Sequence, residues 1–157
     1  MTVEIWAWLA LAAYALHILE EFSLDWRGWA REVLGLPVEW ADFYITNAAV
    51  IVLGLVQAQL SYLLPVVPLS FAALMLINAT FFHIVPIFAA QGRFSPGAIT
   101  AVLLFFPVGI GMYRAAGAQG LLNGWTIGLS IAGGAGLMAF PILLLRLRTL
   151  PYFRQSP

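Results

Sequence analysis

The chain has 157 residues, of which 62% are hydrophobic and only 9% are charged, with no net charge, no cysteine and no lysine. Soluble domains carry about a quarter charged residues, so an ordinary water-soluble globule is excluded. The same composition excludes a disordered segment, a disulfide-stapled secreted module and a basic nucleic-acid-binding protein, whose marks are polarity, cysteine and excess positive charge. The long apolar runs predict an all-α protein: a polytopic membrane helical bundle that forms a single domain over residues 1–157.

Five apolar stretches are long enough to cross a hydrocarbon layer of about 30 Å, which takes roughly 20 helical residues. They lie near Val3–Phe22, Trp40–Leu60, Leu63–Ala90, Pro96–Tyr113 and Trp125–Leu147. Ser95 and Pro96 form a typical N-cap and first helical position, so the fourth helix is expected to begin there. Pro107 and Pro141 predict kinks. We expect the first span to be retained, since Met1–Glu4 lacks the positive charge of a cleavable signal.

The arginines predict the orientation of the chain. With the amino terminus outside, six of the seven arginines fall on the cytoplasmic side and only Arg114 lies outside. The six are Arg27, Arg31, Arg93, Arg146, Arg148 and Arg154. The positive-inside rule therefore favours a multi-pass protein of the cell inner (plasma) membrane, with its amino terminus outside and its carboxyl terminus in the cytoplasm.

A short helix is expected between the first two spans, at Asp25–Leu34. One face of this segment is apolar and carries Trp26, Trp29, Ala30, Val33 and Leu34. Such a helix is typical of the membrane interface, with its tryptophans at headgroup depth. Residues 25–36 could serve as a lid over a site or as a plain connector.

Small residues recur every four positions along the fifth span. Gly124, Gly128, Ala132 and Gly136 form a smooth ridge against which another helix can pack closely. The ridge could form a homodimer surface or a contact within one chain.

The strongest functional signal is a group of polar residues within the predicted spans. Glu20 and Glu21 follow His17 by three and four residues, so all three project from one side of the first helix, and Tyr14 extends this stripe. Counted from the helix ends at 1.5 Å per residue, His17, Asn47 and His83 lie at one depth, roughly 8–11 Å below the cytoplasmic interface. Ionisable groups at that depth are costly and usually face a cavity or one another.

These residues support three functional hypotheses. The first is a metal centre in which His17, Glu21 (or Glu20) and His83 bind one divalent transition metal, zinc or iron, while the other glutamate orients a ligand or acts as a base. The second is metal-free isomerisation, cyclisation or hydrolysis by the Glu20/Glu21 pair as acid and base, with Asn47 holding the substrate. The third is no enzyme at all but a proton- or cation-coupled carrier or a lipid-binding subunit.

In both enzyme hypotheses the substrate is a lipophilic small molecule that enters from the cytoplasmic leaflet. The candidate catalytic residues are Glu20, Glu21, Asn47 and Tyr14. Tyr44 and Arg93 are candidate substrate-binding residues, because an aromatic ring can line an apolar pocket and an arginine can meet an anionic headgroup.

The segment His17-Ile18-Leu19-Glu20-Glu21 carries an H-x-x-E-E pattern. Together with the apolar spans, Asn47, the segment Asn78–His83 and the Gly92–Gly97 turn, it resembles the HXXEE family of small bacterial membrane proteins, which is largely uncharacterised. The resemblance implies functional roles for the histidine and both glutamates but no substrate. Neither an H-E-x-x-H zinc-protease motif nor the E-E-x-x-x-R run of CAAX-type proteases is present, since Asp25 stands where that arginine would be.

Overall fold

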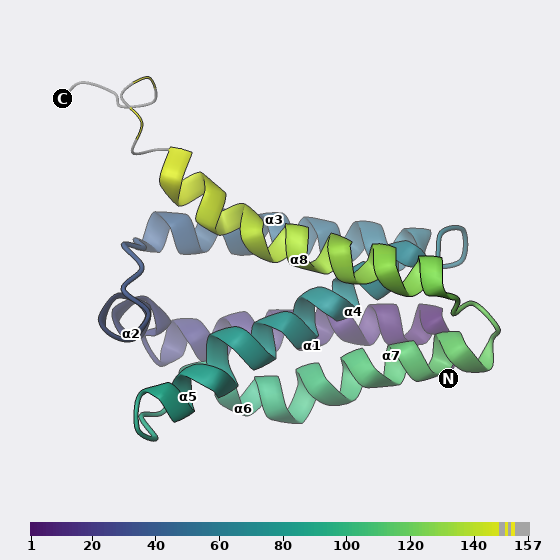
Figure 1. Ribbon diagram of the computed structural model, residues 1–157, viewed down its shortest axis with the longest axis horizontal. Coiled ribbons are helices and arrows are strands. Elements are labelled where there is room, and N and C mark those ends of the chain that lie inside the picture. The colour runs from purple at the N-terminus through teal and green to yellow at the C-terminus, as the bar shows by residue number, and fades with distance from the viewer. Residues whose placement is uncertain (148–149, 151, 153–157) are drawn as a thin grey trace.

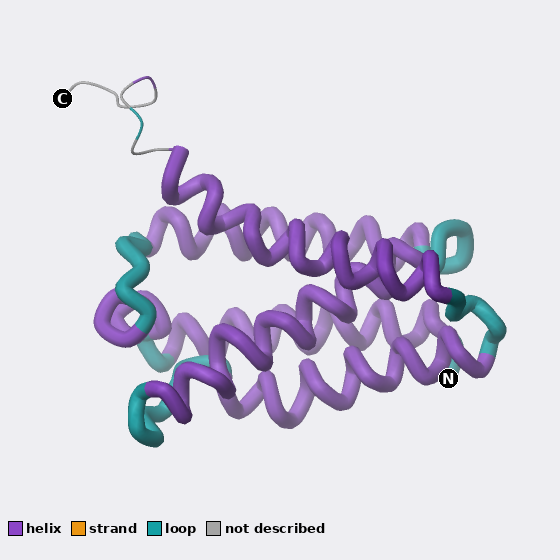
Figure 2. The backbone as a smooth tube through the Cα atoms, in the orientation of Figure 1, coloured by secondary structure: helices purple, strands orange, loops and turns teal. Residues whose placement is uncertain are grey.

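The computed structural model describes residues 1–147, 150 and 152. Within that part of the chain the secondary structure is helical and contains no strand (Figure 2), so the all-α prediction is confirmed. Five helices are long and apolar enough to cross a membrane: Val3–Ser23, Trp40–Leu60, Val66–Ala89, Ala98–Ala118 and Gly124–Leu147. They indicate an integral membrane protein.

The five long helices form one bundle (Figure 1). The first, second and fifth spans are single helices, namely α1 (Val3–Ser23), α3 (Trp40–Leu60) and α8 (Gly124–Leu147). The third span is composite, with α4 (Val66–Asn78), the π-helical segment η1 (Ala79–Ile84) and α5 (Val85–Ala89). The fourth consists of α6 (Ala98–Thr100), the π-helical segment η2 (Ala101–Phe105) and α7 (Phe106–Ala118). The third span is the most buried of the five, with α1, α3, α7 and α8 packed around it.

The buried face of α1 follows a heptad spacing. Residues at alternating intervals of four and three are buried: Val3, Ala7, Ala10, Tyr14, His17 and Glu21. This spacing keeps side chains on the side of the helix that faces its neighbours. The histidine and the second glutamate of the motif therefore continue the packing stripe into the interior of the bundle.

A proline follows each π-helical segment after one intervening residue. Pro86 follows η1 and Pro107 follows η2, each at the second position of the next α-helical segment. Proline lacks an amide hydrogen and clashes with the carbonyl four residues earlier, and a widened turn relieves that clash. At Pro107, where the sequence predicts a kink, the helix is thus irregular through the π-helical segment η2.

The fourth span is displaced from its predicted position. It begins at Ala98 rather than Pro96, because Gly97 adopts a left-handed conformation with φ of +97° that ends the preceding turn. The prediction that Ser95 caps this helix is wrong, because its hydroxyl bonds to His83 instead. The helix ends at Ala118, beyond the predicted Tyr113, since the exposed side chain of Arg114 can reach out along the helix.

The predicted short helix is present as α2 (Trp26–Val33) and lies across one end of the bundle (Figure 1). Its apolar face packs against protein, with Trp29 and Ala30 buried in a small cluster that includes Val38 and Leu145. Outside this cluster, Glu39 accepts hydrogen bonds from two arginines of α2 and so joins α2 to the start of α3.

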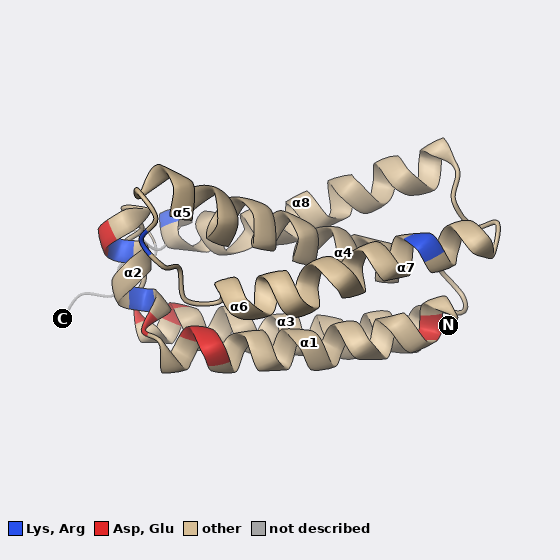
Figure 3. Ribbon diagram, turned by 90° about the horizontal axis from the view of Figure 1, so that it is seen from below, with Lys and Arg blue, Asp and Glu red and all other residues tan. Residues whose placement is uncertain are grey.

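Charged residues gather at the α2 end of the bundle (Figure 3). Arg27 and Arg31 lie on α2, and Arg93, which follows α5, pairs with Glu32 of α2. Arg114 lies at the other end of the bundle, near the carboxyl-terminal end of α7. This distribution agrees with the one used to predict orientation. Arg148 and Arg154 lie outside the described residues, and which end of the bundle faces the cytoplasm stays a prediction.

The small-residue ridge of α8 points away from the bundle. A Cβ atom added at Gly124, Gly128 or Gly136 would have no neighbour within 4 Å among the described residues. The helix packs instead through Gly133 and Gly134, which closely approach Ser70 and the backbone of Ala73. At these glycines the structure does not contain the expected contact within one chain. The use of the ridge as a homodimer surface stays a prediction.

Candidate metal centre

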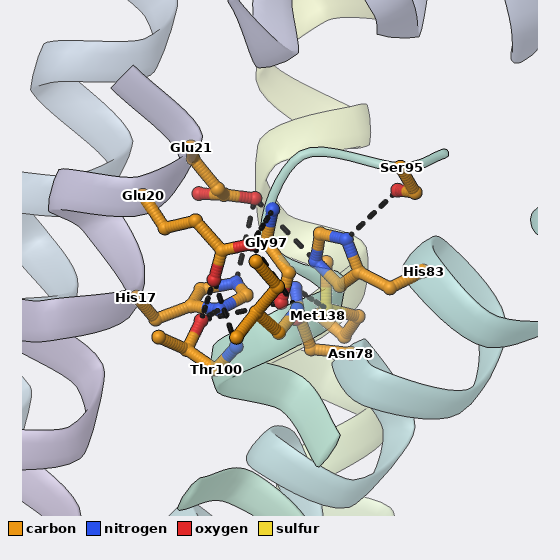
Figure 4. A network of polar contacts seen from close by, with 10 residues as sticks. His17, Glu20, Glu21, Asn78, His83, Ser95, Gly97, Thr100 and Met138 are labelled. Carbon is orange, nitrogen blue, oxygen red and sulfur yellow. Dashed lines mark hydrogen bonds and ion pairs between the residues drawn. The ribbon is translucent and has the colours of Figure 1, made fainter. Parts of the chain in front are cut away.

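The two histidines of the chain lie next to each other although 66 positions separate them in sequence (Figure 4). Their ring centroids are 4.8 Å apart, and the planes are nearly perpendicular. His17 comes from the buried stripe of α1, and His83 lies in the π-helical segment η1. Both side chains are inaccessible to solvent, with exposed fractions of 1% and 0%.

Glu21 completes the cluster. Its Oε1 atom lies 3.4 Å from Nε2 of His17 and 3.5 Å from Nε2 of His83. The three candidate ligand atoms all lie within 4.8 Å of one another. One carboxylate oxygen therefore faces both imidazoles inside the bundle.

The other nitrogen of each imidazole is bonded to a hydroxyl group. Nδ1 of His17 lies 2.8 Å from Oγ1 of Thr100, and Nδ1 of His83 lies 3.0 Å from Oγ of Ser95. The two Nε2 atoms, by contrast, are buried without a hydrogen-bond partner in the described part of the chain. Each ring is thus oriented by its Nδ1 atom and leaves Nε2 available toward Glu21.

Glu20 holds the Thr100 hydroxyl that contacts His17. Its carboxylate accepts hydrogen bonds from the backbone N–H groups of Gly97, Ile99 and Thr100 and from the Thr100 hydroxyl, the last at 2.6 Å. The hydroxyl has one proton, which goes to Glu20 at 2.6 Å rather than to the more distant Gly97 carbonyl at 3.2 Å. The hydroxyl therefore accepts from Nδ1–H of His17, and in the neutral ring Nε2 then carries the lone pair. Carboxylates commonly fix metal-binding histidines in this way, here through an intervening hydroxyl.

Gly97 is required where the fourth span approaches the two rings. A Cβ atom at this position would lie 2.5 Å from Cε1 of His83 and 2.7 Å from Cε1 of His17. Its φ of +97° also disfavours any residue with a side chain. The backbone can therefore close over the imidazoles only with glycine at this position.

Two of the three separations between candidate ligand atoms suit a metal ion. Ligand atoms in a tetrahedral site with bonds of about 2.0–2.1 Å are separated by about 3.3–3.4 Å. The two nitrogen–oxygen separations of 3.4 and 3.5 Å match that spacing, whereas the three atoms together span up to 4.8 Å, so the two imidazoles would move closer together around a bound ion. The buried group formed by His17, Glu21 and His83 could hold such an ion.

A cavity of about 360 Å³ adjoins the cluster on the side of α3 and α8. Glu21 is the one cluster residue that lines it, and Tyr14 and Asn47 are also among its lining residues. Most of the remaining lining is apolar and comes from α3, α4 and the carboxyl-terminal half of α8, including Pro141. Glu21 thus connects the histidine pair to a space large enough for a small molecule.

The remaining predicted residues lie at different places. Tyr14 contacts the His17 ring edge-on, whereas Asn47 lies on the cavity wall and is not part of the His–Glu–His group. Tyr44 is 52% exposed, stacks on Trp40 and does not line the cavity. Arg93 lies on the exposed surface in its pair with Glu32.

Sequence reasoning missed three residues that shape the centre, namely Ser95, Gly97 and Thr100. The first two belong to the Gly92–Gly97 segment, which the sequence identified as a turn with Ser95 as a helix cap rather than as part of the site. An unusual cluster of serine, proline and glycine before an apolar helix was the available signal for them. No sequence signal pointed to the threonine.

Fold and site together define a class of all-helical proteins with five potential membrane spans around a buried His–Glu–His group. The sequence model of the family described as "protein of unknown function with HXXEE motif" matches residues 8–112, about two thirds of the chain. The chain belongs to this family, and every residue of the His–Glu–His group lies within the matched part. No curated protein and no solved structure matches the chain.

Proposed function

We propose that this protein is a metal-dependent membrane enzyme that acts on a lipophilic small molecule, with His17, Glu21 and His83 binding one zinc or iron ion. The observation that carries this proposal is the pair of buried Nε2 atoms, which face the same carboxylate oxygen while hydroxyl groups hold both Nδ1 atoms. Two histidines and one carboxylate are a ligand set of catalytic zinc and non-haem iron sites, which keep a position open.

In this proposal each residue has a separate task. A bound ion would polarise a substrate oxygen or activate a water molecule. Glu20 and Thr100 set the orientation of His17, and Ser95 sets that of His83. Glu21 is at once a ligand and the residue that borders the cavity, so a molecule in the cavity lies beside the centre.

The metal-free alternative has less support because it needs Glu20 and Glu21 to act together as acid and base. The oxygens of Glu20 already accept four hydrogen bonds from the start of the fourth span. A carboxylate held in this way is a structural acceptor rather than a free base. The carrier alternative has no comparable observation in its favour among the described residues.

We further propose that the α2 end of the bundle faces the cytoplasm, as the arginine count predicts. The site then lies near the cytoplasmic leaflet of the plasma membrane, and a lipophilic substrate could reach the cavity from that leaflet.

Metal analysis tests the centre directly. Protein purified without chelators is expected to contain close to one metal ion per chain, and Glu21→Gln should lose most of it because a carboxylate ligand becomes a neutral amide. Glu32→Gln is the matched control, since Glu32 is an exposed glutamate paired with Arg93. Metal near zero in the wild type, or full metal in Glu21→Gln, would contradict the proposed centre.

A second measurement tests the enzymatic part. Lipid extracts of cells that express the wild type are compared by mass spectrometry with extracts of cells that express Glu21→Gln at the same level. The proposal predicts a lipophilic compound that is consumed or formed only with the wild type. Identical extracts would count against enzymatic activity.

A further inference from the structure

The cavity beside the centre contains neutral polar groups that the metal site does not use. Asn78, the last residue of α4, lines this cavity and is 7% exposed. Its Nδ2 atom lies 3.9 Å from Sδ of Met138, and its Oδ1 atom has no hydrogen-bond partner among the described residues. Nε1 of Trp26, at the α2 end of the cavity, is likewise buried and unpaired in that part of the chain.

Buried polar atoms are nearly always hydrogen-bonded, so an unpaired acceptor that lines a cavity indicates a missing donor. A ligand hydroxyl can supply that donor to Oδ1 of Asn78. Asn78 precedes His83 by five residues in the same span, which puts it about one helical turn deeper in the bundle than the proposed metal centre. A hydroxyl bound there would leave the rest of the molecule to extend past Glu21.

The charge of the cavity selects against anionic ligands. Glu21 and Asp42 are its charged lining residues, and no arginine or histidine lines it. Beside Asn78, away from the ion proposed at Glu21, a carboxylate or phosphate would therefore find no basic side chain in the lining. Since both unpaired polar groups are neutral, the lining matches an uncharged molecule.

The size of the cavity limits the length of the ligand. A volume of about 360 Å³ corresponds to roughly a dozen non-hydrogen atoms at the packing of a liquid, about 30 Å³ each. We propose that the cavity binds an uncharged amphiphile of this size, an alcohol whose hydroxyl donates to Oδ1 of Asn78 and whose alkyl chain lies against the apolar wall. Its conversion at the neighbouring centre rests on the proposed function, whereas its binding does not require the metal.

Photolabelling in lipid nanodiscs tests this inference. The probe is n-decanol that carries a diazirine in its alkyl chain, and the competitors are n-decanol, decanoate and decane at matched membrane concentrations. We expect cross-links to map to cavity residues such as Phe82 and Ile142. Decanol should compete at least tenfold better than decanoate or decane, a comparison that needs no variant.

The variant Asn78→Leu removes the acceptor at nearly constant volume and should weaken competition by decanol about fivefold to tenfold, the value of one hydrogen bond. Gln57→Leu is the matched control, because Gln57 is also a buried amide with an unpaired Oε1 but does not line the cavity. Equal competition by decanol and decanoate, cross-links outside the cavity, or unchanged competition in Asn78→Leu would overturn the inference.

The outcomes separate this inference from the proposed function. Alcohol preference in a wild-type protein that contains no metal would support the alcohol site and refute the metal centre. Full metal content without alcohol preference would refute the alcohol site alone. Metal content is therefore measured on the samples used for labelling.

Discussion

The hydroxyl of Thr100 is the connection between Glu20 and His17. It lies 2.8 Å from Nδ1 of the histidine and donates to Oε2 of the glutamate at 2.6 Å. Thr100→Val replaces this hydroxyl by a methyl group of similar size, so its contacts with His17, Glu20 and the Gly97 carbonyl are lost while packing is retained. The backbone N–H of residue 100 still donates to Glu20, so the helix start is preserved.

The expected effect is a tenfold to hundredfold weaker affinity for the metal. Without the hydroxyl, Nδ1–H of His17 is left buried without its acceptor, which costs about 1–3 kcal/mol. That cost arises when the ring adopts the tautomer that presents Nε2 to the ion. At 1.4 kcal/mol per factor of ten, this energetic cost corresponds to a tenfold to hundredfold loss of metal affinity. A loss of that size is also typical for residues that orient metal ligands.

The affinity is measured by competition with a chelator of known zinc affinity on protein reconstituted in detergent. Thr80→Val is the matched control, because Thr80 lies in η1 near His83 but its hydroxyl donates only to the carbonyl of Leu76. Thr100→Ser restores the hydroxyl and should recover most of the affinity. If Thr100→Val binds metal within twofold of the wild type, the proposed orientation of His17 through Thr100 is refuted.

Three further predictions follow from the geometry around the centre and at the α2 end. Gly97→Ala should abolish metal binding, because its Cβ would overlap both imidazoles. Gly92→Ala is the control and should keep the metal, because Gly92 also has a positive φ but has open space around it. Equal metal contents of the two variants, purified without chelators, would contradict this prediction. Glu20→Gln should lower stability by about 1–3 kcal/mol through lost charge-assisted hydrogen bonds to the fourth span, and an unchanged thermal unfolding midpoint in detergent would refute that role. The hydrogen bond from Arg27 lowers the pKa of Glu39 from its ordinary value of 4.5. This contact therefore stabilises the junction between α2 and α3 at pH values above 4.5, and the stabilisation is lost as the pH falls through the lowered pKa. Hydrogen exchange in α2 should therefore accelerate on acidification below about pH 4.5 in the wild type but not in Glu39→Gln, and equal pH profiles would count against the contact.

Much of the fold could be predicted because membrane spans are encoded locally. Five apolar stretches and a minimum helix length determine the spans, and the second span, Trp40–Leu60, has the predicted boundaries. The fourth span could not be delimited in this way. Its start depends on the backbone conformation at Gly97, and its end depends on whether the arginine near its end can extend its side chain out of the helix.

The candidate site was predictable in part for the same reason. The spacing of His17 and Glu21 on one helix face and a common depth with His83 are properties of regular helices, and the structure brings these side chains together. Asn47 has a similar depth but lies on the cavity wall, since depth along the membrane does not specify the direction in which a side chain points. Nothing in a single sequence states which faces of separate helices meet.

The two adjacent glutamates of the motif differ in role because they differ in direction. Glu21 stands four residues after His17 and continues the heptad stripe of α1 into the bundle, whereas Glu20, one residue earlier, is turned toward the fourth span. Its carboxylate accepts from the N–H groups that begin that span, so the contact that orients His17 is also a contact that docks two spans. The same docking brings Gly97 against both imidazoles. The His–Glu–His group is therefore oriented only once the first, third and fourth spans have packed, which links formation of the centre to assembly of the bundle.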